Sequence, residues 1–125
     1  MNLSQNRKKL KFLISRLENL AEVFCSRQPL IKGSIYKTKT KCGSDNCRCA
    51  REGQLHEVWR VTRSHQGKTQ TRTLKPQEVS KYKKYTRSYR SHRKARAELV
   101  KLNKKLLKVV DEIEKEKRKI LKGIK

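Results

Sequence analysis

A run of three cysteines is the part of the chain whose residue types and spacing suit the most specific chemistry. Cys42, Cys47 and Cys49 fall within eight residues, and His56 follows seven residues after the last of them. Zinc binds four tetrahedral ligands from cysteine and histidine, and sites that stabilise a fold fill all four positions. The sequence therefore predicts a structural Zn²⁺ site with the ligands Cys42, Cys47, Cys49 and His56.

Three alternatives to this site remain open. Cys25, at the end of the first predicted helix, competes with His56 as the fourth ligand, although a lone cysteine there is more often a small core residue. The second alternative is that His56 is a plain surface histidine. A redox or iron–sulfur site is the third, although the short Cys-x-Cys spacing differs from the common ferredoxin runs. The paired sequences of the zinc deaminases are absent from the chain, so we expect a structural and not a catalytic metal.

The charge balance indicates the class of partner. The 125 residues include 35 lysines and arginines against 11 acids, which gives a formal net charge of +24 and a pI of about 10.4. A polyanion relieves the repulsion within so basic a chain and gains entropy from released counterions. We therefore expect nucleic acid, DNA or RNA, as the partner. A merely soluble surface and an anionic membrane surface are the alternatives.

The basic residues are densest between positions 81 and 96, where the chain has no acid. They are Lys81, Lys83, Lys84, Arg87, Arg90, Arg93, Lys94 and Arg96. On a helix, the interleaved Tyr82, Tyr85 and Tyr89 share one face, where they either pack as core or stack on bases. Arg60, Arg63 and Arg72 on the predicted strands could form a second nucleic-acid contact.

Hydrophobic spacing predicts the elements that must position these groups. A helix with Ser4 as its N-cap runs to about Ser26, with its apolar seam at three- and four-residue intervals. The seam residues are Leu10, Leu13, Leu17, Leu20 and Phe24. Strands follow at 33–41, 57–63 and 69–74, joined by the cysteine loop and a turn at 64–68. A helix from Pro76 to about Leu121 continues with a second seam. That seam comprises Leu99, Leu102, Leu106, Val109, Ile113 and Ile120, with Glu116 among them.

These elements predict an α+β fold. Its parts are an N-terminal helix (1–28), a three-stranded antiparallel meander with a zinc loop (33–75) and a long basic coiled-coil helix (76–125). We expect them to form one structural unit, with the two helices packed antiparallel, seam on seam. Whether the long helix breaks near Ser88–Ser91 stays open. Its surplus seam could pair in a homodimer or bind a protein partner.

Nothing in the sequence predicts a membrane protein. No run of 18 or more apolar residues occurs, and the first residues lack the features of a signal peptide. We therefore expect a cytoplasmic protein, with association with the nucleoid as a further possibility.

The middle of the chain resembles an uncharacterised family of small bacterial and archaeal proteins. The similar segments are Gly33-Ser34-Ile35-Tyr36, Thr40-Lys41-Cys42-Gly43, Asn46-Cys47-Arg48-Cys49-Ala50 and Gly53-Gln54-Leu55-His56. The resemblance covers about residues 32–95 and implies a zinc-ribbon-like module, often encoded near mobile-element genes such as transposons, without an activity. This chain departs from the family pattern after His56, where Glu57-Val58-Trp59 replaces Gly-Pro-aromatic.

Together these features predict a nucleic-acid-binding accessory protein and not an enzyme. The acids are scattered apart from one group on the last helix, whereas metal nucleases need clustered carboxylates. A coiled-coil protein-interaction adaptor and a ribosome- or RNA-associated factor are the alternative functions.

Overall fold

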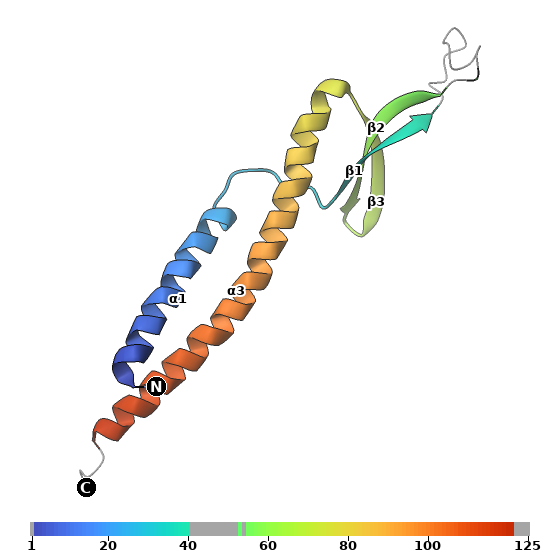
Figure 1. Ribbon diagram of the computed structural model, residues 1–125. Coiled ribbons are helices and arrows are strands. Elements are labelled where there is room, and N and C mark those ends of the chain that lie inside the picture. The colour runs from blue at the N-terminus through green and yellow to red at the C-terminus, as the bar shows by residue number, and fades with distance from the viewer. Residues whose placement is uncertain (1, 41–52, 54, 122–125) are drawn as a thin grey trace. The chain divides into compact units, whose positions relative to one another are not determined.

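The computed structural model describes residues 2–40, 53 and 55–121 and shows an α+β fold. The elements along the chain are α1 (Leu3–Phe24), β1 (Gly33–Thr40), β2 (His56–His65), β3 (Lys68–Leu74), the 3₁₀ turn η1 (Pro76–Glu78) and α3 (Val79–Ile120) (Figure 1). The predicted order of an N-terminal helix, a three-stranded antiparallel sheet and a long C-terminal helix is confirmed. The predicted zinc loop lies almost entirely outside the described residues.

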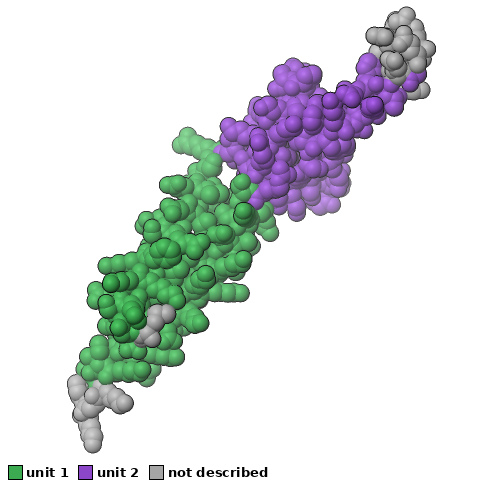
Figure 2. All heavy atoms as spheres, viewed as in Figure 1, with its two compact units in different colours: residues 1–27, 91–125 green, residues 28–90 purple. Residues whose placement is uncertain are grey.

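The chain divides into two compact units (Figure 2). Unit 1 comprises residues 1–27 and 91–125, and unit 2 comprises residues 28–90. The division differs in kind from the three predicted regions, because α3 contributes its first turns to unit 2 and the rest to unit 1. The helix is continuous through Ser88–Ser91, which answers the question that the sequence left open.

In unit 1, α1 and the second part of α3 pack along the predicted seams. Leu13, Leu102 and Val109 are buried there. The half-buried residues packed against them are Leu10, Leu17, Leu20, Leu106 and Ile113. The helices are antiparallel, because Phe24 contacts His92 edge-to-face at 5.1 Å between ring centroids while Arg16, earlier in α1, pairs with the later Glu98 at 3.7 Å. Ile120 is 67% exposed, so the predicted seam ends before it.

The first turn of α1 differs from the prediction. Asn2 and not Ser4 is the N-cap, and its side-chain oxygen accepts a hydrogen bond from the backbone N–H of Gln5 at 2.8 Å. The Gln5 side chain accepts in return from the backbone N–H of Asn2 at 3.3 Å. This reciprocal capping box satisfies two helix-end donors at once. Ser4 as N-cap would lack this advantage, because its N3 position is occupied by Arg7 and not by a glutamate or glutamine.

Asn6 extends the seam of unit 1 toward the start of α1. It is 1% exposed, and neither its side-chain nitrogen nor its oxygen has a hydrogen-bond partner among the described residues. It precedes Leu10 and Leu13 at the same three- and four-residue intervals. A buried amide of this kind lowers stability, because it gives up hydrogen bonds to water without replacing them.

In unit 2, the three strands form one antiparallel sheet in the order β1-β2-β3. The register pairs Ile35 with Val61 and Val61 with Arg72, which places these three residues on the same face. That face carries the core of unit 2, made of buried Val61, Leu74 and Val79 from the first turn of α3. Half-buried Ile31, Ile35, Trp59 and Tyr82 pack around it.

Two glycines in the sheet occupy positions that other residues would strain. At the turn into β3, Gln66 and Gly67 have φ of 51° and 76°, the left-handed pair of a two-residue hairpin, so the turn is tighter than the predicted 64–68. At the start of β1, a Cβ built on Gly33 would lie 2.0 Å from the backbone oxygen of Thr62. Position 33 therefore accepts only glycine at this strand separation.

Candidate nucleic-acid interface

The first turns of α3 present a stripe of cations beside the sheet. Val79 and Thr86 are buried, and Lys83, Arg87 and Arg90 are exposed on the adjoining flank of the same helix. Their three- and four-residue spacing places these three side chains one above another along α3. These three residues are exposed although they adjoin the buried flank, so the helix packs on the sheet without burying the three charges.

A hollow in unit 2 opens between this stripe and the strand β2. Its volume is about 400 Å³. Its lining residues are Trp59, Pro76, Val79, Ser80, Lys83 and Arg87. The ammonium of Lys83 lies 4.3 Å from the centroid of the Trp59 ring, and that of Lys37, the register partner of Trp59 on β1, lies 5.9 Å away. The indole is thus surrounded by cations on a wall of the hollow.

A second hollow, of about 240 Å³, continues along the same flank of α3 toward β1. Its lining residues are Ser34, Ile35, Lys83, Thr86, Arg87 and Arg90. Lys83 and Arg87 line both hollows. We call the two together the Trp59 groove.

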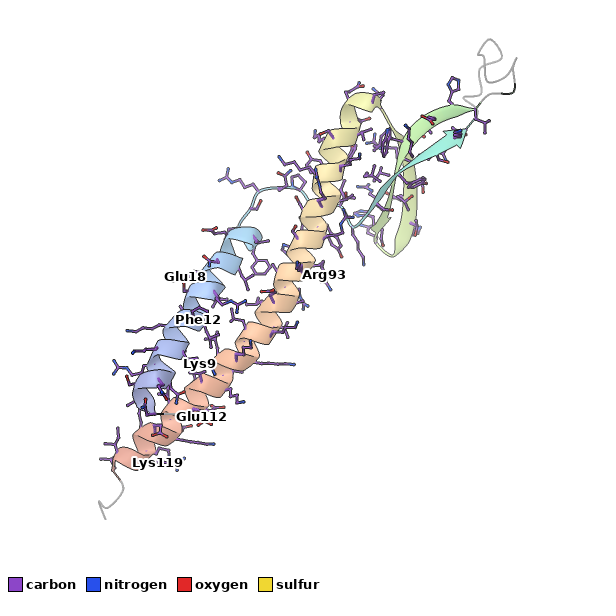
Figure 3. The ribbon with its side chains drawn as sticks, in the orientation of Figure 1. Lys9, Phe12, Glu18, Arg93, Glu112 and Lys119 are labelled. Carbon is purple, nitrogen blue, oxygen red and sulfur yellow. The ribbon has the colours of Figure 1, made fainter. Side chains whose placement is uncertain are left out.

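The remaining helical cations of the predicted interface lie outside this groove. Lys81 and Lys84 are exposed on α3, and the Lys81 ammonium is 5.9 Å from the Tyr85 ring centroid. Arg93, Lys94 and Arg96 are exposed on the part of α3 that belongs to unit 1, where Figure 3 labels Arg93. The eight residues therefore share one helix but do not line one hollow.

The three tyrosines of α3 are half-buried. Tyr82 packs on the core of unit 2 and meets Tyr85 edge-to-face, with 5.9 Å between ring centroids. The Tyr82 hydroxyl accepts a hydrogen bond from Arg72, whose guanidinium carbon also lies 5.0 Å from the ring centroid. For Tyr82, the simpler interpretation of core packing agrees with these contacts.

The strand arginines do not share one surface. Arg63 and Arg72 belong to the face that carries the core, whereas the pleat places Arg60 on the opposite face, beside Tyr36 in the register. Arg63 donates to the Gln70 side chain at 3.2 Å. The Nε of Arg60 is buried and has no hydrogen-bond partner among the described residues. Sequence alone groups these three arginines, and the register separates them.

Two carboxylates in unit 2 are held ionised by basic neighbours. The backbone N–H of Lys75 donates to Glu78 at 3.0 Å, and with the Arg72 guanidinium at 3.1 Å it keeps the pKa of Glu78 below its usual value. The ammonium of Lys37, 2.9 Å from Glu57, lowers the pKa of that carboxyl in the same way. Glu78 also fixes the entry into α3, where Pro76 begins η1 and not the α-helix itself as predicted.

The predicted metal ligands divide between the described residues and the rest of the chain. Cys42, Cys47 and Cys49 lie outside the described residues. His56 is the first residue of β2 and pairs with Thr40, the last residue of β1. Cys25 caps the end of α1 in unit 1 and is exposed. Within residues 2–40, 53 and 55–121, no three His, Cys, Asp or Glu side chains gather closely enough to hold a metal ion.

Sequence reasoning missed Trp59, which lines this groove, and Lys37, whose ammonium lies near the Trp59 ring. Trp59 occurs in a predicted strand, where a tryptophan indicates core packing, and Lys37 alternates along a strand like an edge-protecting lysine. The chain has one tryptophan, and its position 24 residues before Lys83 gave no local signal of their contact. The register of β1 and β2 and the packing of α3 bring the three together.

Two further findings bear on the class of protein. Among the described residues, no helix is both long enough and apolar enough to cross a membrane. No curated protein and no solved structure matches the chain. A family model described as a domain of unknown function (DUF6788) matches residues 5–84, which span α1, the sheet and the first turns of α3. Because that match covers more than half of the chain, the protein belongs to this family of uncharacterised domains.

Proposed function

We propose that the protein is a nucleic-acid-binding accessory protein that holds a phosphate backbone against unit 2. The observation that carries the proposal is the Trp59 groove, which is lined by three exposed cations on one flank of α3. The segment from position 81 to 96 that includes them has no acid to repel a phosphate. Such contacts supply affinity through counterion release and carry no sequence information by themselves.

The spacing of the cations suits a polymer of regularly repeated charge. Lys83 and Arg87 are separated by about 6 Å along the helix axis, and Arg87 and Arg90 by about 4.5 Å. A nucleic-acid strand carries one charge per roughly 3.4 Å of axial rise, so several phosphates can lie within reach of the stripe. DNA and RNA offer the same backbone charge, and an RNA-associated role, including one on the ribosome, is part of this proposal.

A structural zinc site in the loop after β1 is the second part of the proposal. Thr40 and His56 are paired across the ladder, so the two ends of the cysteine loop are joined at one point of the sheet. Cys42 follows Thr40 by two residues, a distance of at most about 7 Å along the chain. This placement supports His56 as the fourth ligand beside Cys42, Cys47 and Cys49. It fits the zinc-ribbon-like module that the sequence resemblance implies, together with its mobile-element setting.

Unit 1 supports the alternative of a protein-interaction adaptor. Phe12 is 62% exposed on α1, and Leu107 and Val110 of α3 are 56% and 47% exposed. Figure 3 labels charges of both signs along these helices, with Lys9 and Glu18 on α1 and Glu112 and Lys119 on α3. Apolar residues between mixed charges are typical of helices that pair with another helix.

A salt series on the zinc-loaded chain tests the binding proposal. The test variant is Lys83→Gln, Arg87→Gln and Arg90→Gln combined, and the matched control replaces Lys104, Lys108 and Arg118 of unit 1 by glutamine. Both triples remove three charges. The slope of log affinity against log salt is negative, and we expect its magnitude to decrease by about 2–3 in the groove variant only. Equal losses in the two variants would show a diffuse charge effect and would contradict a site in unit 2.

Metal content tests the zinc proposal. We expect one zinc ion per chain, retained in Cys25→Ser and lost in Cys47→Ser and in His56→Ala, as measured by elemental analysis of the purified protein. Zinc that survives in His56→Ala but is lost in Cys25→Ser would make Cys25 the fourth ligand. A wild-type chain without zinc would overturn this part of the proposal and leave the groove untouched.

A further inference from the structure

Trp59 packs against the core of unit 2 and also lines the groove, and packing alone does not require the second. It is half-buried against Val61, Leu74 and Val79, yet it also lines the hollow of about 400 Å³. The Lys83 ammonium lies 4.3 Å from its ring centroid, so a group from the groove side reaches the indole. Hollows of about 300–1,000 Å³ are the size of small-molecule sites, so this one can hold a nucleobase.

The groups around the indole match the parts of a nucleotide. A base can stack on the indole, as bases of any sequence stack on the aromatic side chains of single-strand-binding proteins. Lys83 and Arg87 stand on the same wall of the hollow and donate only, as phosphate partners must. The stripe from Lys83 to Arg90 spans about 10 Å of helix, which is the rise of about three stacked nucleotides.

We propose that the Trp59 groove binds an unpaired nucleotide within a single-stranded segment of DNA or RNA. The base stacks on Trp59 in the place that the Lys83 ammonium holds in the free protein. Lys83 turns to the adjacent phosphate, and Arg87 and Arg90 bind the phosphates that follow. A base inside a duplex cannot enter, because both of its faces are already stacked and its edge is paired. This inference rests on the proposed nucleic-acid binding and adds to it the kind of strand.

The single tryptophan makes the stacking directly measurable. Trp59 is the one tryptophan of the chain, so tryptophan fluorescence reports on this site alone. We expect single-stranded DNA or RNA to quench the emission of the zinc-loaded wild-type protein, and a blunt duplex of the same sequence to leave it nearly unchanged. Comparison of the two single strands identifies the preferred sugar.

Substitution tests the same contact without the fluorophore. In binding assays with labelled oligonucleotides, we expect Trp59→Leu to weaken single-strand binding roughly 5- to 100-fold, with partial recovery in Trp59→Phe. Duplex binding should not change. Tyr36→Leu is the matched control, because Tyr36 is an aromatic residue that is 38% exposed on the opposite face of the sheet.

The outcomes separate this inference from the function on which it rests. Single-strand binding that is unchanged in Trp59→Leu, or an emission that no single strand quenches, would overturn the stacking site. If the Lys83, Arg87 and Arg90 variant still loses affinity in that case, nucleic-acid binding stands. Absence of binding to any strand at physiological salt would overturn both. If Trp59→Leu fails to fold, the affinity of Trp59→Phe and the quenching of the wild-type emission still test the stacking site.

Discussion

The two units of this protein have the same charge and almost the same length, but they are stabilised in different ways. Unit 1 has 19 basic and 7 acidic residues, unit 2 has 16 and 4, and each has a formal net charge of +12. Unit 1 buries one continuous seam of leucine, isoleucine and valine. The apolar core of unit 2 is Val61, Leu74 and Val79, with aromatic rings and cations around it. Equal charge therefore does not give equal surfaces.

The position of the acids explains the difference. In unit 1, acids alternate with lysines along α3, as in the pairs Glu112–Lys115 and Glu116–Lys119, each at 3.6 Å. In unit 2, Glu57 and Glu78 are paired with Lys37 and Arg72, and neither carboxylate is among the residues that line the Trp59 groove. Unit 1 thus has a mixed surface suited to other helices, and unit 2 has a groove of one sign suited to a polyanion.

Removal of the proposed zinc ion should separate the units most strongly. Structural zinc sites in small domains bind with apparent free energies of about 10–16 kcal/mol, most of which stabilises the fold. We expect chelation, or Cys47→Ser, to abolish amide-exchange protection in β1 and β2 while the seam of α1 and α3 stays protected. Hydrogen exchange read by mass spectrometry measures both at once. Protection that survives in the sheet would show that the core of Val61, Leu74 and Val79 is sufficient.

Matched core truncations should act on one unit each. Leu13→Ala and Leu74→Ala remove the same atoms from residues that are 3% and 4% exposed. Each should lower the free energy of unfolding of its own unit by about 2–5 kcal/mol. Phe12→Ala, at a 62% exposed position, is the control and should change stability little. Denaturant unfolding with exchange data assigns the loss, and a loss spread over both units would contradict their independence.

Asn6 offers a way to strengthen unit 1 alone. Asn6→Leu replaces a buried amide without hydrogen-bond partners among the described residues, so it should raise the stability of unit 1 by about 1–3 kcal/mol. Asn103→Leu, at an exposed position of α3, should have little effect. Thermal unfolding compares the two variants. A loss of stability in Asn6→Leu would indicate a bound water or another partner at this position.

The hairpin turn offers a smaller change in unit 2. Gly67→Ala should lower the stability of the sheet by about 1 kcal/mol, because φ at this position is 76° and a Cβ disfavours it. Apart from the two neighbours in the chain, no atom of the described residues lies within 4 Å of the added Cβ, so the effect should come from the backbone and not from a clash. Urea unfolding measures it. A neutral result would show that the turn can change type without disturbing the strands.

The smallest expected effect is a pH dependence at the entry to α3. Since the pKa of Glu78 lies below its usual 4.5 in the folded protein, its contribution to stability is fully present above about pH 4.5 and is lost as the pH falls through the lowered value. Glu78→Gln should therefore be less stable than wild type near neutral pH and should approach it in acid. Urea unfolding across pH tests this, with Glu114→Gln on exposed α3 as control. A difference that does not shrink in acid would contradict the assignment.

The sequence by itself determined the features that depend on near neighbours. The seams of α1 and α3 follow from three- and four-residue spacing, and the hairpin follows from glycine between alternating strands, because each is set by residues a few positions apart. The density of positive charge between 81 and 96 is likewise visible without a fold. The N-cap was less predictable, because Asn2 and Ser4 both suit the role and only the reciprocal bond with Gln5 favours Asn2.

Only the tertiary structure decided which charges act together. Arg60 and Arg63 are three residues apart on one strand, and the pleat places them on opposite faces. Trp59 and Lys83 are 24 residues apart, and they meet because α3 packs on the face that carries Val61. Asn6 is 1% exposed despite its polarity, which its local sequence does not predict. Contacts between distant segments depend on register and on the rotation of a helix about its axis, and neither is encoded in local spacing.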